Sequence, residues 1–159
     1  LGVQTCALPI SNIRGRQYLQ VGDLAKARPL LEEAHRRSPE SAPFALDICR
    51  ILFESKDYDG VRNVALPFYR DKQNYEFAQY LGESSQALGR YDEAINFYKD
   101  YLTHFGTNLN VLNSIGDCYV QTGDLAGAIT VWKRSLELAP AQPELKKKLA
   151  GIQDKIKEE

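Results

Sequence analysis

Residues 112–140 read LNSIGDCYVQTGDLAGAITVWKRSLELAP, and this stretch decides the fold. Its apolar residues recur at helical spacing in two stripes, which the Gly123-Asp124 pair separates. A glycine readily ends a helix, and an aspartate beside it accepts the free amide protons of the next helix's first turn. Pro140 follows the second stripe, where a proline blocks continuation of the helix. The stretch therefore predicts two helices joined by a short turn.

The same pattern occurs 34 residues earlier in the chain. The matched small and aromatic residues are Gly82 with Gly116, Ala94 with Ala128, and Tyr98 with Trp132. A period of this length is typical of stacked helical repeats, in which each unit buries its apolar face against its neighbours. Weaker copies precede these two at steps of 33 or 34 residues. The expected units are 11–41, whose beginning is missing, then 42–74, 75–108 and 109–142.

The pattern resembles the tetratricopeptide repeat, whose signature runs W-x2-L-G-x2-Y, then A-x3-F, then P. The fourth unit matches this signature at Ile115-Gly116, Tyr119, Ala128, Trp132 and Pro140. The second unit is degenerate: it has Cys49, Val61 and Ala65 in place of the glycine, the alanine and the aromatic residue. The resemblance implies an all-α protein, a right-handed α-α superhelix of tetratricopeptide-type helix pairs. Interior prolines, Pro29 and Pro67, predict strain or a kink in the second helices of the first two units.

Residues 143–159 predict one further amphipathic helix after the last pair. Its apolar face consists of Leu145, Leu149, Ile152 and Ile156, and lysines lie on its other faces. We expect a capping helix, because the last unit of an array needs a partner for its exposed core and a polar outer side. A membrane-surface helix is the alternative, but acidic residues nearly balance the lysines.

The first ten residues (1–10) are interpreted as an adapter-derived artefact that does not belong to the fold. Gly2–Ile10 resembles the conceptual translation of a common sequencing adapter, and the chain contains no methionine. The sequence therefore indicates a fragment whose true N-terminus is missing. What lies upstream of Ser11 stays open, and so does the cellular compartment, although unpaired cysteines favour the reducing cytoplasm.

Composition and motifs disfavour an enzyme, a nucleic-acid binder and a membrane span. The 20 Lys and Arg residues against 21 Asp and Glu give a net charge of -1, whereas nucleic-acid binders normally carry a basic patch. No apolar run approaches the length of a membrane helix. His35 and His104 stand near the ends of second helices, and Cys49 and Cys118 match core positions, so neither pair predicts catalysis or a metal site. We expect a non-catalytic protein without metal or cofactor.

The remaining candidate is a binding surface. In tetratricopeptide proteins the first helices line a concave groove that holds an extended peptide or a partner helix, which the resemblance implies here. The candidate groove residues are Arg16, Asp47, Arg50, Glu54, Glu76, Tyr80, Glu83, Asn110, Asn113, Asp117 and Gln121. From Asp47 onward this set contains five acids and one base, which predicts a protein or peptide ligand with Lys or Arg. Two alternatives stay open: ordinary solvated helix faces, and a docking domain of a larger enzyme or envelope protein.

Overall fold

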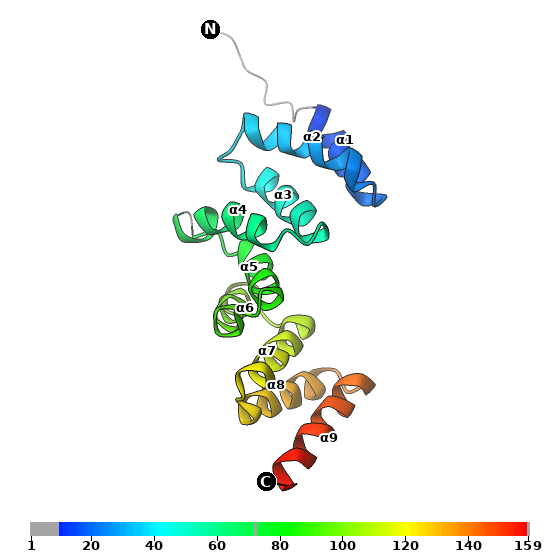
Figure 1. Cartoon of the computed structure of the whole chain (residues 1–159), viewed down its shortest axis with the longest axis vertical. Helices are drawn as coiled ribbons and strands as arrows, with labels where there is room; N and C mark the ends of the chain where they lie inside the picture. The colour runs from blue at the N-terminus through cyan, green and yellow to red at the C-terminus, as the bar shows by residue number, and fades with distance from the viewer. Residues whose placement is uncertain (1–9, 72, 159) are drawn as a thin grey trace. The chain divides into compact units, whose positions relative to one another are not determined.

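The computed structural model describes residues 10–71 and 73–158, which form helices and short connections without a strand. The described helices (Figure 1) are α1 (Ile10–Gln20), α2 (Leu24–Arg37), α3 (Ala42–Glu54), α4 (Tyr58–Asp71), α5 (Phe77–Ala87), α6 (Tyr91–Phe105), α7 (Leu109–Thr122), α8 (Leu125–Leu138) and α9 (Pro143–Glu158). The predicted all-α class is confirmed. Residues 2–9 of the adapter-like segment lie outside the described residues.

The turns within the helix pairs follow the predicted chemistry. Asp23, Asp57 and Asp124 each accept a hydrogen bond from the backbone N–H three residues further on, at 3.2, 2.9 and 2.8 Å. Gly123, which ends α7, has a φ of 84°, a left-handed conformation that disfavours residues with a side chain. Pro29 lies inside α2 and Pro67 lies inside α4. Both helices continue past their proline.

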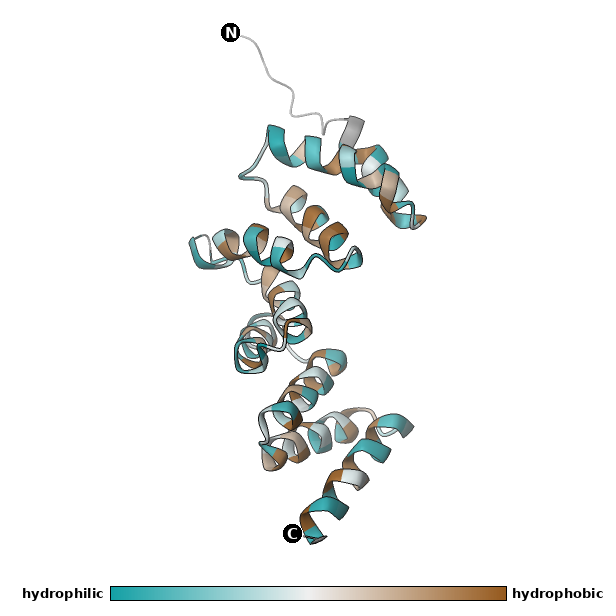
Figure 2. Ribbon diagram, in the orientation of Figure 1, coloured by the Kyte–Doolittle hydropathy of each residue, from teal (hydrophilic) through white to brown (hydrophobic). Residues whose placement is uncertain are grey.

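The chain divides into two compact units, the first ending at Tyr80 and the second beginning at Leu81. In the first unit, Gly15 of α1 lies directly against Leu31 of α2, where an added Cβ would approach the leucine Cγ to 2.7 Å. The α3 helix, brown over much of its visible length in Figure 2, buries six residues. Phe68 and Phe77 stack with ring centroids 4.8 Å apart. The first unit therefore has an apolar core of its own.

In the second unit each of the two glycines that recur with the repeat, Gly82 and Gly116, faces a large aromatic side chain of the following helix. The ring of Tyr98 covers Gly82, and the indole of Trp132 covers Gly116. These rings also pack against the next element in the chain, Tyr98 against α7 and Trp132 against α9. The two aromatics thus contact both the glycine of their own helix pair and the helix that follows.

The α9 helix packs on the last pair through part of its predicted apolar face. Leu145 and Ile152 are buried beside Trp132, and Leu149 packs against the same cluster. Ile156 differs from the prediction, because 44% of it is exposed. The apolar stripe of α9 therefore continues one turn beyond the core of the last helix pair.

The cysteines outside the N-terminal segment are core residues, as their positions in the pattern predicted. Cys49 and Cys118 are both buried and unpaired. Burial raises the pKa of each thiol to about 12, so neither forms the reactive thiolate near neutral pH.

Candidate functional site

The candidate groove residues are divided between the two units. The first unit contains Arg16, Asp47, Arg50, Glu54, Glu76 and Tyr80, and the second contains Glu83, Asn110, Asn113, Asp117 and Gln121.

In the first unit, the predicted acidic position on α3 is already paired with a cation of the chain. Arg16 Nε lies 2.7 Å from Asp47 Oδ2, and Asn12 Nδ2 donates a hydrogen bond to the same oxygen at 3.2 Å. The Asp47 side chain is only 15% exposed. Arg50 and Glu54 of the same helix are exposed. Asp47 and Arg16 thus hold α1 to α3, and Asp47 contributes little negative charge to a ligand.

The remaining two candidates of the first unit differ in their surroundings. Glu76 was expected on a first helix, but it lies in the turn before α5, where Asn74 Oδ1 accepts its backbone N–H at 3.1 Å. Tyr80 is half-buried, and its ring meets Phe53 edge-on with centroids 6.4 Å apart. Tyr80 therefore belongs partly to the packing of α3 and α5.

In the second unit, Asn113 is a structural residue. Its Nδ2 donates a hydrogen bond to Gln142 Oε1 at 2.8 Å, and its backbone carbonyl accepts one from Trp132 Nε1 at 3.2 Å. Gln142 in turn donates to the carbonyl and hydroxyl oxygens of Ser135. These bonds fix the connection between α8 and α9, so the Asn113 Nδ2 group is engaged within the chain, and its Oδ1 is buried.

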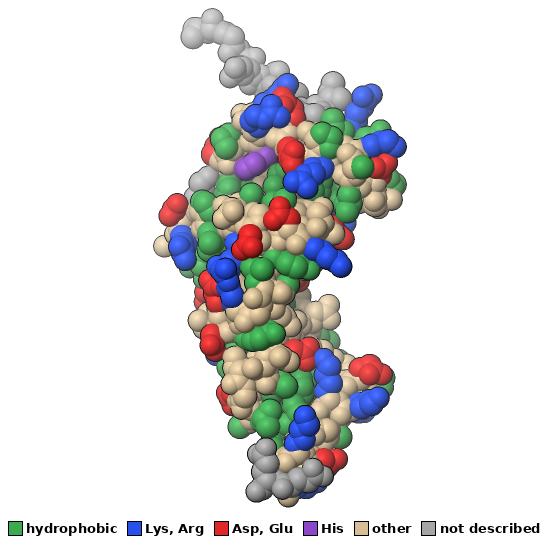
Figure 3. All heavy atoms as spheres, in the orientation of Figure 1, with side chains coloured by type: hydrophobic (Ala, Val, Ile, Leu, Met, Phe, Trp, Pro, Cys, Tyr) green, Lys and Arg blue, Asp and Glu red, His purple; other side chains and the backbone are tan. Residues whose placement is uncertain are grey.

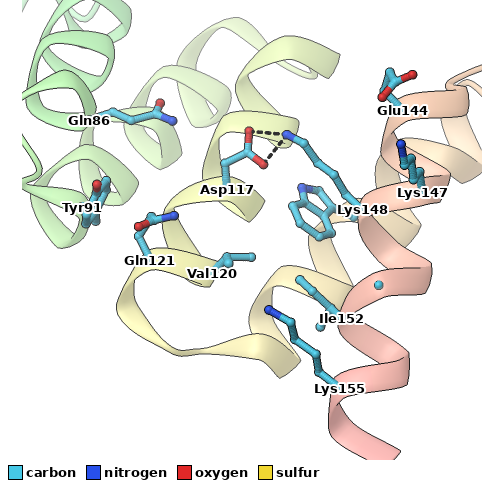
Figure 4. A pocket seen from close by; sticks show the side chains of 12 residues that line it. Gln86, Tyr91, Asp117, Val120, Gln121, Glu144, Lys147, Lys148, Ile152 and Lys155 are labelled. Atoms are coloured by element: carbon cyan, nitrogen blue, oxygen red, sulfur yellow. Dashed lines mark hydrogen bonds and ion pairs between the residues drawn. The ribbon is translucent and has the colours of Figure 1, made fainter.

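Asp117 forms an ion pair that the sequence analysis did not include. Lys148 Nζ of α9 lies 2.7 and 2.9 Å from its two carboxylate oxygens (Figure 4). The same ammonium group stands 5.8 Å from the Trp132 ring centroid, within the range of a cation–π contact. Two of the five groove acids, Asp47 and Asp117, are therefore neutralised by the chain itself.

An open pocket of about 820 Å³ lies in the second unit, among side chains of α5 to α9. Of the predicted residues, Asp117 and Gln121 line it, whereas Glu83, Asn110 and Asn113 do not. The lining that sequence reasoning missed is mainly the α9 wall of Glu144, Lys147, Lys148, Ile152 and Lys155 (Figure 4). The signal for this wall in the sequence is the lysine-rich composition of the helix, which is also typical of the polar outer side of a cap.

The histidines show no arrangement typical of catalysis. His104 is exposed, and its Nδ1 lies 2.8 Å from the Asp100 carbonyl one turn earlier. His35 is half-buried, and burial lowers its pKa, which favours the neutral ring. Over the described ranges 10–71 and 73–158, no three His, Cys, Asp or Glu side chains are grouped as a metal would require. No helix in those ranges combines the length and apolarity needed to cross a membrane.

In successive helix pairs of this chain, a small residue packs under an aromatic ring. This arrangement defines a class of helical repeat protein. The family model of the tetratricopeptide repeat matches residues 18–66 and 86–152. The chain therefore belongs to the tetratricopeptide repeat family.

Solved structures show the same fold. A MamA fragment from Desulfovibrio magneticus RS-1 superimposes with a TM-score of 0.84 at 15% identity, covering 95% of this chain and 88% of that one. MamA AMB-1 gives a TM-score of 0.74 at 22% identity, with coverage of 89% and 78%. The APC/C hetero-tetramer Cut9-Hcn1 gives 0.76 at 20% identity, covering 89% of this chain and 29% of that one. Comparison with curated proteins found no significant match.

Proposed function

We propose that this chain is a non-catalytic protein-interaction module, which binds a peptide or a partner helix on the faces of its first helices. The pocket of the second unit is the principal site. The observation that carries this proposal is the set of residues that line the pocket. Exposed polar groups surround an apolar floor, and helices α5, α7 and α9 all contribute residues to the pocket. A site of this kind holds a ligand through shape and hydrogen bonds, without needing a reactive group.

The preference for a basic ligand, predicted from the sequence, now rests on fewer acids. Glu54 and Glu76 of the first unit are exposed, and neither belongs to the ion pairs that neutralise Asp47 and Asp117. The affinity of the chain for basic peptides should therefore depend on these two carboxylates. This preference stays a separate prediction about the first unit.

A display selection of random peptides on the folded chain tests the proposal. Gln121→Trp fills the mouth of the pocket, so peptides selected on the parent chain should bind it at least tenfold more weakly. Gln20→Trp is the matched control, since Gln20 is also an exposed helical glutamine but lies in the first unit, away from the pocket. Peptides rich in Lys or Arg should instead weaken with Glu54→Lys plus Glu76→Lys and with added salt.

Two results would contradict the proposal. One is a selection that yields no peptide sensitive to either Gln121→Trp or Glu54→Lys plus Glu76→Lys. The other is an equal loss of binding with Gln20→Trp and Gln121→Trp.

A further inference from the structure

Resting on the proposed function, we infer that the pocket of the second unit selects an acidic peptide segment that also carries an apolar side chain. This ligand class differs from the basic one that the first-helix sequence predicted. The difference arises from α9, which the sequence analysis treated only as a cap.

The pocket lining contains three lysines and two acids, a net excess of one positive charge. The charged residues of the lining are Asp117, Glu144, Lys147, Lys148 and Lys155. Lys148 and Asp117 cancel each other in their bidentate contact. No described residue forms an ion pair with Lys147 or Lys155, and both are exposed. Lys and Arg side chains accordingly appear along α9 in the space-filling view (Figure 3).

The uncharged polar lining adds hydrogen-bond donors. Tyr98 Oη donates to Gln86 Oε1 at 2.8 Å, so the oxygen of this amide is engaged and its NH₂ group is left to the pocket. In Figure 4 the nitrogen of Gln86 points towards α7, above the exposed amide of Gln121. Amide and ammonium donors that line one pocket match a carboxylate, because charge-assisted hydrogen bonds are stronger than those between neutral groups.

The floor of the pocket is apolar. Val120 of α7 and Ile152 of α9 face the same space (Figure 4), and Trp132 of α8 also lines it. Gly151 leaves this side of α9 open, because an added Cβ there would meet no atom within 4 Å. A ligand backbone can therefore approach α9 closely and place an apolar side chain over the floor.

The size of the pocket suits a short segment rather than a single residue. Its volume of about 820 Å³ lies within the range of pockets that hold peptide-sized or drug-sized ligands. Several consecutive residues, acidic and apolar in alternation, would satisfy both the lysines and the floor.

A fluorescence titration tests the inference. The probe is the peptide Leu-Glu-Glu-Leu-Glu-Glu-Leu, acetylated and amidated so that it has no terminal charge. Trp132 is the only tryptophan of the chain and lines the pocket, so its emission reports occupancy. We expect a saturable change in emission, at least tenfold weaker affinity for peptides with Gln or Lys in place of Glu, and weaker binding at higher salt.

Charge reversal on α9 distinguishes the pocket from the general charge of the helix. Lys147→Glu plus Lys155→Glu should weaken binding of the Glu peptide at least tenfold. Lys146→Glu plus Lys157→Glu is the matched control, with the same charge change on the same helix at positions outside the pocket, and should weaken it less than threefold.

Equal effects of the two pairs, or equal binding of the Glu and Lys peptides, would overturn the inference. An unchanged Trp132 emission with the Glu peptide would overturn it as well. If display-selected peptides remained sensitive to Gln121→Trp in that case, the proposed function would stand and only the ligand class would be wrong. Loss of both kinds of binding would overturn the two proposals together.

Discussion

Trp132→Ala should lower the free energy of unfolding of the second unit by about 3–5 kcal/mol, the usual cost of emptying a buried aromatic site. Trp132 is 2% exposed and packs against Leu145 and Ile152 of α9. Its Nε1 also donates to the Asn113 carbonyl at 3.2 Å. Without the indole, Leu145 and Ile152 of α9 lose the largest side chain of the cluster in which they are buried.

Urea denaturation followed by circular dichroism measures this effect. Phe105→Ala is the control, because Phe105 is also an aromatic residue of a second helix but is 50% exposed. We expect the control to change stability by less than about 1 kcal/mol. Similar losses for the two variants would show that Trp132 is not the centre of the core between α8 and α9.

Gly82→Val should lower the free energy of unfolding by about 3 kcal/mol, at the upper end of the usual cost of overpacking a core. An added Cβ at this position would lie 2.5 Å from both Cδ1 and Cε1 of Tyr98. The ring has little room to move, since Tyr98 is buried against α7 and its hydroxyl is hydrogen-bonded to Gln86. The helices α5 and α6 would have to separate.

Gly151→Ala provides the contrast in the same denaturation measurement. Gly151 is a helical glycine with open space where the Cβ would stand. Alanine there should raise stability by up to about 1 kcal/mol, because alanine favours the helix more than glycine does. If Gly82→Val proved as stable as the parent chain, the close approach of Gly82 and Tyr98 would not be a requirement of the fold.

The helix pairs were predictable because their signals are local. A glycine and an aspartate in sequence, such as Gly123 and Asp124, determine where one helix ends and the next begins. Gly116 and Trp132 occupy positions that repeat with the period of the unit. The contact between them therefore follows from the packing of the two helices of a pair. Family membership followed from the same few residues.

The site was only partly predictable, because its properties depend on which side chains meet in space. Helical spacing placed Asp47 and Asp117 on exposed faces, but it did not show that Arg16 and Lys148 neutralise them. Helical spacing placed Asn113 on an exposed face, as it did Gln121. The Asn113 side chain nevertheless donates a hydrogen bond to Gln142, which lies in the connection between α8 and α9. The amphipathic pattern of α9 predicted which side is buried, and it did not predict that the lysines on its flank line a pocket.

Hydrogen exchange of the parent chain, with and without a display-selected peptide, tests the central claim most directly. The account predicts slower exchange in the backbone amides of α7 and α9, together with the C-terminal half of α5, because these elements line the pocket. The amides of α2, which lies wholly in the first unit, should keep their rates. Protection confined to other helices, with α7 and α9 unchanged, would contradict the claim that this pocket is the binding site.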